Sequence, residues 1–167
     1  MIFQRFYPTK EVDSAYNIDY EGLYQQGIRG LIYDIDNTLT EHDAPAGENT
    51  VALIKRLKSI GFGICLLSNN KEERVKMFNQ DIHVQYIHKA GKPSVKGYQQ
   101  AMELMGTNKD TTVFIGDQLF TDIYGANRSG ITSYLVSPIA KHEEIQIVLK
   151  RYLERIVLHF YHKDSRK

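Results

Sequence analysis

Several residue types that would point to a particular class of protein are scarce in this sequence. Its 167 residues include no tryptophan, four prolines and one cysteine, and the formal net charge is +1. A single cysteine excludes an internal disulfide, so we expect a reducing compartment and a small buried side chain at Cys65. Because the charges nearly cancel, the composition does not favour nucleic acid as a partner.

Long hydrophobic runs are also missing, since no stretch of about 18 apolar residues occurs. The first residues, MIFQRFYPTKEV, lack the apolar centre of a signal peptide. We therefore expect a cytoplasmic protein, with peripheral contact at the inner face of a membrane as an alternative. With 42% hydrophobic and 25% charged residues, the chain should fold as a single domain over 1–167.

Short apolar runs alternate with helical patterns along the chain. The predicted strands are 30–35, 63–68, 83–88, 111–116 and 132–137, and the predicted helices are 49–60, 71–79, 94–105, 120–130 and 142–161. This alternation predicts a doubly wound, Rossmann-like α/β fold, with a five-stranded parallel sheet and helices on both faces. In such folds the functional site lies at the carboxyl ends of the strands.

Acidic residues gather at that predicted edge. Asp34 and Asp36 end the first strand, and Asp117 and Asp122 follow the fourth. Carboxylates at one edge repel each other unless a cation lies among them, and hard oxygen ligands suit Mg²⁺. We expect Asp34 and Asp117 to bind it directly and Asp122 to bind it directly or through water. Asp36 belongs to the same metal-binding group, although its side chain is expected to stay free of the ion.

Donors that suit a phosphoryl group come from the same strand ends. Thr38, Ser68, Asn69 and Lys92 are the candidates for holding its oxygens. In an extended segment Asp34 and Asp36 point the same way, so both can face one phosphate. Asp34 would attack phosphorus, while Asp36 would protonate the leaving alkoxide and later deprotonate a water.

In this order, these groups resemble the four motifs of the haloacid dehalogenase (HAD) superfamily. The matching segments are DIDNT at 34–38, Ser68, Lys92 in AGKPS, and GDQLFTD at 116–122, and the resemblance covers about residues 28–137. It implies a Mg²⁺-dependent phosphatase that forms an aspartyl-phosphate. The gaps between the motifs are too short for an inserted cap domain, which implies the capless class III (IIIA) type.

The segments DIDNTLT, LLSNN, AGKP and IGDQLFTD together resemble the YqeG-type branch. That branch is similar to phosphatidylglycerophosphate phosphatases, so the resemblance implies an anionic phospholipid substrate and a role in phospholipid biosynthesis. An open, capless site also favours a large or surface-presented substrate. A phosphoprotein, a nucleic-acid end or a soluble metabolite remain alternatives, as does a binding or scaffold protein that keeps only the fold.

The last predicted helix is amphipathic, with a wide apolar side. Its apolar residues are Ile145, Val148, Leu149, Tyr152, Leu153, Ile156 and Phe160. They cover an arc of roughly 200°, whereas about 100° is enough to cover a core. Either this side packs on the sheet, or its surplus contacts a membrane or a second copy in a homo-oligomer. In the membrane interpretation, Arg151 and Arg155 would face anionic lipid.

Overall fold

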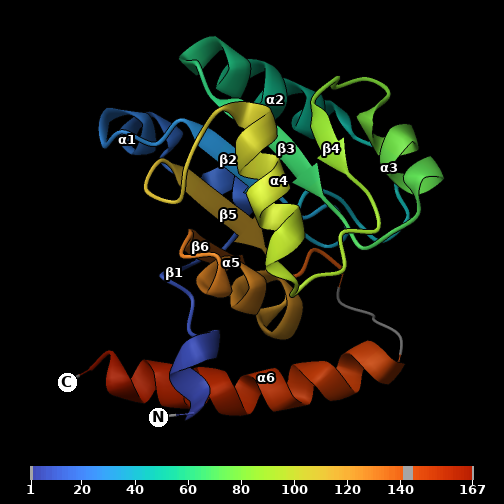
Figure 1. Ribbon diagram of the computed structural model, residues 1–167. Coiled ribbons are helices and arrows are strands. Elements are labelled where there is room, and N and C mark those ends of the chain that lie inside the picture. The colour runs from blue at the N-terminus through green and yellow to red at the C-terminus, as the bar shows by residue number, and fades with distance from the viewer. Residues whose placement is uncertain (1, 141–144, 167) are drawn as a thin grey trace.

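Six parallel strands form one sheet in the computed structural model, which describes residues 2–140 and 145–166. The strands are β1 (Lys10–Val12), β2 (Gly30–Tyr33), β3 (Gly63–Leu67), β4 (Gln85–Ile87), β5 (Thr112–Gly116) and β6 (Thr132–Val136). Their order across the sheet is β1-β6-β5-β2-β3-β4 (Figure 1). The parallel α/β architecture with helices on both faces is therefore confirmed.

The prediction of five strands was one short, because β1 lies at the edge of the sheet. Its sequence, KEV, contains no apolar run, and two of its three residues are exposed. It joins the sheet by pairing in parallel with β6, with Lys10 opposite Tyr134. Such an edge strand is held by backbone hydrogen bonds to its partner, so its side chains need not show the apolar pattern of a strand.

The helices are α1 (Tyr20–Gln25), α2 (Glu48–Ile60), α3 (Glu72–Asn79), α4 (Val95–Met105), α5 (Tyr124–Arg128) and α6 (Ile145–Asp164). Two short 3₁₀ turns, η1 (Ile2–Phe6) and η2 (Ala15–Asn17), and a single π-helical turn, η3 (Leu119–Ile123), complete the elements. The helix predicted at 120–130 is thus divided into η3 and α5. Only a loop joins β2 to α2, and only α3 with its loops separates β3 from β4, so neither place holds a cap.

The core lies on both faces of the sheet. Along β2, Leu31 and Tyr33 pack with α1, α2 and α3, whereas Ile32 faces α4 and α5. This alternation follows from the two-residue period of a strand, and burial on both sides explains the continuous apolar run. Cys65 lies in the second layer and is fully buried, as expected of a small core residue, and burial raises the pKa of its thiol to about 12.

Helix α6 lies along one end of the molecule, beyond the β1–β6 edge, and η1 packs beside it (Figure 1). Phe3 stacks on Phe160 with ring centroids 5.2 Å apart, and Val157 packs with Leu135 of β6. The helix extends three residues past the predicted end, whereas residues 142–144 of the prediction fall outside the described residues. Within 2–140 and 145–166, no helix has the length and apolar character needed to cross a membrane.

Candidate active site

The sheet register brings the first and fourth motifs together. Strand β2 pairs with β5, with Tyr33 opposite Ile115, and the Asp34 amide donates to the Ile115 carbonyl at 3.0 Å. Asp34 and Asp117 therefore emerge side by side from neighbouring strands. Ser68 follows β3, the neighbour of β2 on its other side. The strand ends thus converge as the sequence predicts.

Three of the predicted acids form one buried group. Asp34, Asp117 and Asp122 are 8%, 2% and 1% exposed, and one oxygen from each lies within 4.8 Å of the others. Lys92 reaches into this group, and its Nζ donates to Asp34 Oδ1 and Asp122 Oδ1, both at 2.7 Å. The lysine therefore compensates part of the charge of two carboxylates at once.

Burial and mutual repulsion make these acids weaker. Burial first, and then the charge of Asp122, raise the pKa of Asp34 from 3.8 to about 6, against the opposing effect of Lys92. Burial and the charges of Asp34 and Asp122 hold the pKa of Asp117 well above its usual range. For Lys92, burial works toward a lower pKa, but the carboxylates of Asp122 and Asp34 outweigh it, so its pKa is raised. A further cation would therefore be favoured here.

Asp122 shapes the loop that carries Asp117. Its Oδ2 accepts from the backbone amides of Asp117 at 3.2 Å and Gln118 at 3.1 Å, because the π-helical turn η3 directs it back toward β5. Gly116 makes this possible, since a Cβ there would lie 2.7 Å from Asp122 Oδ2. Both oxygens of Asp122 are thus occupied, one by Lys92 and one by the loop.

Two carboxylate oxygens remain well placed for a metal ion. Lys92 and Arg151 take Asp34 Oδ1 and Asp117 Oδ2, whereas Asp34 Oδ2 and Asp117 Oδ1 both lie 3.4 Å from the Thr38 hydroxyl. These two oxygens therefore converge on one point from different strands. Hard, anionic donors of this kind suit a divalent cation such as Mg²⁺. The residues present fit such an ion.

Asp36 has different neighbours from Asp34, although both were expected to face one phosphate. Its carboxylate accepts from Arg74 Nη2 at 2.9 Å, Asn70 Nδ2 at 2.7 Å and the Asp43 amide at 2.9 Å. Strand β2 ends at Tyr33, so the alternation of an extended strand does not continue through Asp36. Asp36 lies at the site, but its side chain is held on the α3 side.

Arg74 is a site residue that the sequence did not reveal. It comes from α3, and its side chain is only 9% exposed. Its Nε is buried without a hydrogen-bond partner among the described residues and lies 3.7 Å from Asp43 Oδ1. Within KEERVKMFN it resembles any exposed helical arginine, and only the fold brings it to Asp36.

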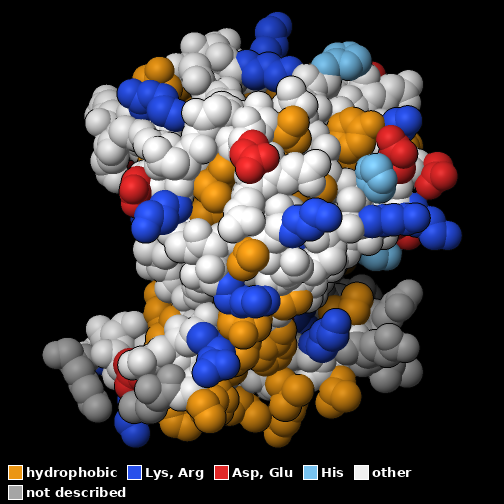
Figure 2. Space-filling model, in the orientation of Figure 1, with side chains coloured by type: hydrophobic (Ala, Val, Ile, Leu, Met, Phe, Trp, Pro, Cys, Tyr) orange, Lys and Arg blue, Asp and Glu red, His pale blue; other side chains and the backbone are white. Residues whose placement is uncertain are grey.

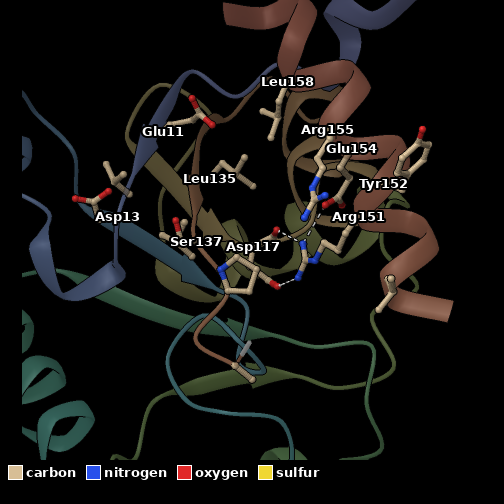
Figure 3. A pocket seen from close by; sticks show the side chains of 15 residues that line it. Glu11, Asp13, Asp117, Leu135, Ser137, Arg151, Tyr152, Glu154, Arg155 and Leu158 are labelled. Carbon is tan, nitrogen blue, oxygen red and sulfur yellow. Dashed lines mark hydrogen bonds and ion pairs between the residues drawn. The ribbon is translucent and has the colours of Figure 1, made fainter. Parts of the chain in front are cut away.

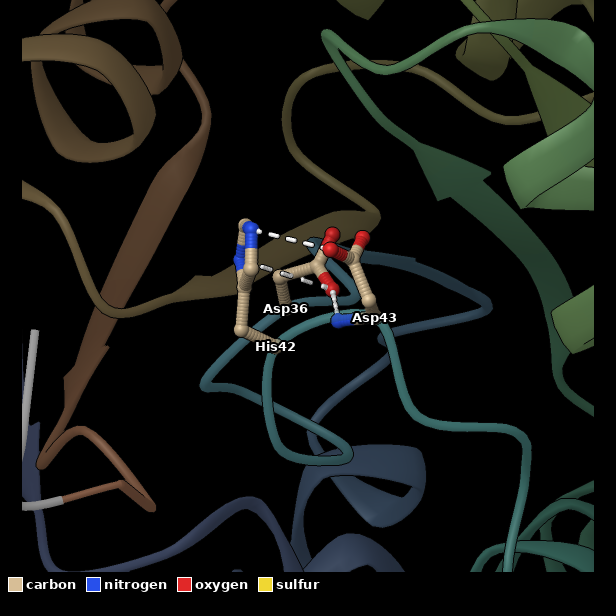
Figure 4. A group of neighbouring side chains, drawn as sticks. All are labelled: Asp36, His42 and Asp43. Carbon is tan, nitrogen blue, oxygen red and sulfur yellow. Dashed lines mark hydrogen bonds and ion pairs between the residues drawn. The ribbon is translucent and has the colours of Figure 1, made fainter. Parts of the chain in front are cut away.

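A more exposed group lies over Asp36. His42 Nε2 is 3.4 Å from an Asp43 oxygen, and His42 Nδ1 is 3.9 Å from Asp36 Oδ1 (Figure 4). These side chains come from the loop between β2 and α2. They place an imidazole and a second carboxylate at the rim of the site.

Ser68 and Asn69 follow β3 as predicted, but their contacts differ. Ser68 is buried at the site, and its hydroxyl accepts from the Asn70 amide at 3.1 Å. The Asn69 side chain accepts from the Lys92 amide at 2.8 Å and donates to the Lys92 carbonyl at 3.3 Å. Asn69 therefore fixes the backbone that carries the lysine.

Arg151 of α6 reaches the acidic group, which corrects the expectation that it faces lipid. It donates from Nη1 to the Asp117 carbonyl at 2.6 Å and to Glu154 at 3.0 Å, and from Nη2 to the Asp117 carboxylate. Glu154 in turn accepts from the Leu119 amide at 2.9 Å. The inward side of α6 thus carries a charged pair that holds the loop after β5.

A pocket of about 690 Å³ lies between α6, β1 and β6. Asp117, Arg151 and Arg155 contribute to its wall, together with apolar side chains such as Leu135 and Leu158 (Figure 3). The pocket therefore connects the acidic group with the inner side of α6. Its walls come from four segments that are distant in the sequence, and of its lining residues only Asp117 lies in a motif.

Comparison with known proteins agrees with this geometry. Residues 89–146 match the family model described as HAD-hydrolase-like. The probable phosphatase YqeG of Bacillus subtilis is 36% identical over 159 residues, which cover 95% of this chain and 92% of that protein. The chain belongs to the YqeG-type family of HAD phosphatases.

Two further comparisons place the YqeG-type chain among more distant proteins. The chloroplastic/mitochondrial phosphatidylglycerophosphate phosphatase 1 of Arabidopsis thaliana is 28% identical over 96% of this chain, which spans only 48% of that protein. A cobalt-bound deoxy-D-mannose-octulosonate 8-phosphate phosphatase of Haemophilus influenzae has a TM-score of 0.55 at 16% identity, over 66% of this chain and 69% of that one. The structural similarity supports the HAD fold.

Proposed function

We propose that this YqeG-type phosphatase is a single-domain, Mg²⁺-dependent phosphomonoester hydrolase that acts through an aspartyl-phosphate on Asp34. The observation that carries the proposal is the buried group of three carboxylates joined by Lys92 at the carboxyl end of the sheet. Burying like charges is costly, and a cation that binds among them reduces this cost and can in turn attract an anionic ligand. A phosphoryl group and a divalent metal together satisfy the site.

Asp34 and Asp117 would hold the metal through the oxygens that converge near Thr38. Bound there, Mg²⁺ would neutralise the carboxylates and the phosphoryl oxygens. Asp122 would act indirectly, because its oxygens already hold Lys92 and the loop amides. Asp36 would not bind the metal through its side chain, so its carboxylate would serve for proton transfer.

In the first half of the reaction, Asp34 attacks phosphorus while the bond to the leaving oxygen breaks. Asp36 gives its proton to the leaving alkoxide. In the second half, Asp36 takes a proton from a water that attacks phosphorus and releases Asp34. To do this, Asp36 must exchange its contact with Arg74 or Asn70 for a substrate oxygen.

The transferred oxygens are held by groups that already point into the site. Lys92 supplies a fixed positive charge, and Ser68 and Thr38 supply hydroxyl donors. Asn69 supports the Lys92 backbone, which favours a bracing role over direct phosphate contact. These donors are preorganised by the fold, so little rearrangement opposes the transition state.

For the substrate, we propose a phosphatidylglycerophosphate-like phospholipid. The Arabidopsis relative, a phosphatidylglycerophosphate phosphatase, supports it, and so does the site without a cap. A lipid substrate implies peripheral contact with a membrane and a role in phospholipid biosynthesis. A soluble phosphate ester is the alternative that the same residues could process.

The test is phosphate release from phosphatidylglycerophosphate in mixed micelles and from a soluble aryl phosphate, each with Mg²⁺ or with chelator. We expect Mg²⁺-dependent release from both, faster from the lipid, and none from Asp34→Asn. Trapping with radiolabelled phosphate should label wild type but not this variant. An active Asp34→Asn variant would overturn the mechanism, and release from the aryl phosphate alone would overturn the substrate.

A further inference from the structure

Helix α6 is amphipathic in an unusual sense, because it also turns an apolar face toward solvent. The outward face of α6 consists of Val148, Leu149, Tyr152, Leu153 and Ile156, which are between 41% and 64% exposed. These are five of the nine exposed large hydrophobic side chains among the described residues. Packing against the N-terminal segment and the sheet edge holds for Phe160, which stacks on Phe3, but not for these five side chains, which have no partner within the described chain.

Among the described residues of α6, the exposed lysine, arginine, aspartate and glutamate side chains are all positively charged. Arg155 and Lys163 are exposed on α6, and the helical period places Arg155 at the border of the outward face and Lys163 in line with it. The two carboxylates of the helix are turned elsewhere, since Glu154 is buried against Leu119 and Asp164 accepts from the Tyr7 hydroxyl at 3.0 Å. Figure 2 shows hydrophobic side chains gathered over α6, with lysine and arginine side chains beside them.

We propose that the outward face of α6 docks on an anionic lipid bilayer. Apolar side chains of this kind enter the boundary between headgroups and acyl chains, while flanking lysine and arginine side chains meet anionic headgroups. A second copy fits less well, because a two-fold pairing of the same helix would bring like charges together, and the described part of α6 has no exposed carboxylate to balance them. The occupant with complementary charge is the lipid surface.

Docking through this face would also place the site beside its substrate. Val148 and Tyr152 belong to the outward face and also line the pocket whose wall includes Asp117. On the inward side, Arg151 holds Asp117 directly. The apolar surface and the acidic group are thus joined through one helix, so a phospholipid at that surface has a short route to the site. This consequence rests on the proposed function, whereas the docking itself does not.

The test is co-sedimentation with vesicles of phosphatidylglycerol and phosphatidylcholine in equal parts, against vesicles of phosphatidylcholine alone. We expect the full chain to bind the anionic vesicles at low salt and to release them as salt rises. The triple variant Leu149→Gln, Leu153→Gln, Ile156→Gln should bind roughly tenfold more weakly or worse, because three apolar side chains no longer enter the lipid. The control Met77→Gln, Leu104→Gln changes exposed apolar residues on α3 and α4 and should bind as wild type.

Charge reversal gives an independent variant. Arg155→Glu with Lys163→Glu should weaken binding to anionic vesicles by a similar factor, whereas Lys55→Glu with Lys109→Glu, which makes the same change of net charge elsewhere, should not. Circular dichroism checks that each variant is folded. The proposal is overturned if wild type ignores anionic vesicles at low salt, or if the triple variant binds them equally well.

Two measurements separate lipid docking from the proposed phosphatase activity and from pairing with a second copy. The triple variant should hydrolyse the soluble aryl phosphate as fast as wild type. Vesicle binding and hydrolysis of this ester are therefore separate readouts, and either proposal can be overturned without the other. Sedimentation velocity tests the second-copy alternative. A wild-type dimer that the triple variant dissociates, together with no vesicle binding, would overturn lipid docking.

Discussion

The carboxyl end of the sheet buries charged side chains that water usually solvates, whereas the outward face of α6 exposes apolar side chains that are usually buried. At the sheet, Asp34, Asp117 and Asp122 are withdrawn from water, whereas α6 leaves large apolar side chains exposed to it. Lys92 and Arg151 offset part of the first cost, but no described contact offsets the second. A fold that keeps two such costs fits a protein that meets a cation and a phosphate at one region and a lipid surface at the other.

After the loss of Asp34 itself, the largest effect should come from removing the proton-transfer group Asp36. We expect Asp36→Asn to lower kcat/KM, which reports the phosphorylation of Asp34, by about 10²–10⁴-fold for an alkyl phosphate, because no acid would remain to protonate the leaving oxygen. The loss should be smaller with a nitrophenyl ester, whose leaving group needs no proton. Asp43→Asn, in the same loop, is the matched control and should stay near wild type. Equal losses with both esters would contradict the role of Asp36.

The two arginines of α6 contrast a side chain that holds the acidic group with an exposed one. Arg151→Gln should lower the free energy of unfolding by about 3 kcal/mol in chelator, since it leaves the buried Asp117 charge without its guanidinium. Arg155→Gln should change it by less than about 0.5 kcal/mol, because Arg155 is exposed. Urea unfolding measures both, and equal effects would contradict a stabilising contact between Arg151 and Asp117. Saturating Mg²⁺ should restore part of the loss in Arg151→Gln.

The pH dependence of stability probes the cost of the buried acids. Because the pKa of Asp34 is raised from 3.8 to about 6, the folded state holds its proton more tightly than the unfolded state does. In chelator, Asp34 therefore stabilises the fold most below about pH 4, and this contribution of roughly 2–3 kcal/mol is lost as the pH rises through 6. Urea unfolding from pH 4 to 7 should show a shallower fall in Asp34→Asn. An identical slope in the two proteins would contradict the assignment.

The smallest expected effect compares two adjacent side chains of α6. Val157 is 3% exposed and packs with Leu119 and Leu135, whereas Ile156 is 41% exposed. Val157→Ala should cost about 2 kcal/mol of unfolding free energy, because it opens a gap in the packed side. Ile156→Ala should cost no more than about 0.5 kcal/mol, although isoleucine loses more atoms. A larger loss at Ile156 would show that the outward face is covered in solution.

Much of the fold followed from local patterns. Strands β2 and β5 are buried on both faces, so their apolar runs were plain in the sequence, and their tips located Asp34 and Asp117. Strand β1 was missed because it pairs with β6 through backbone hydrogen bonds, and the side chains of KEV show no strand pattern. Arg74 was missed because α3 had to be placed before its side chain could meet Asp36.

By itself, the sequence determined the parallel α/β fold, the order of the HAD motifs and the convergence of their acids at one edge. Buried strands need continuous apolar runs, and parallel strands end at the same edge, so local composition was enough. Only the tertiary structure decided which side of α6 turns inward. Periodicity shows that a helix has two sides, but not which of them packs inward. The inward side is determined by contacts with distant groups, since Arg151 donates to the Asp117 carboxylate and Glu154 accepts from the Leu119 amide.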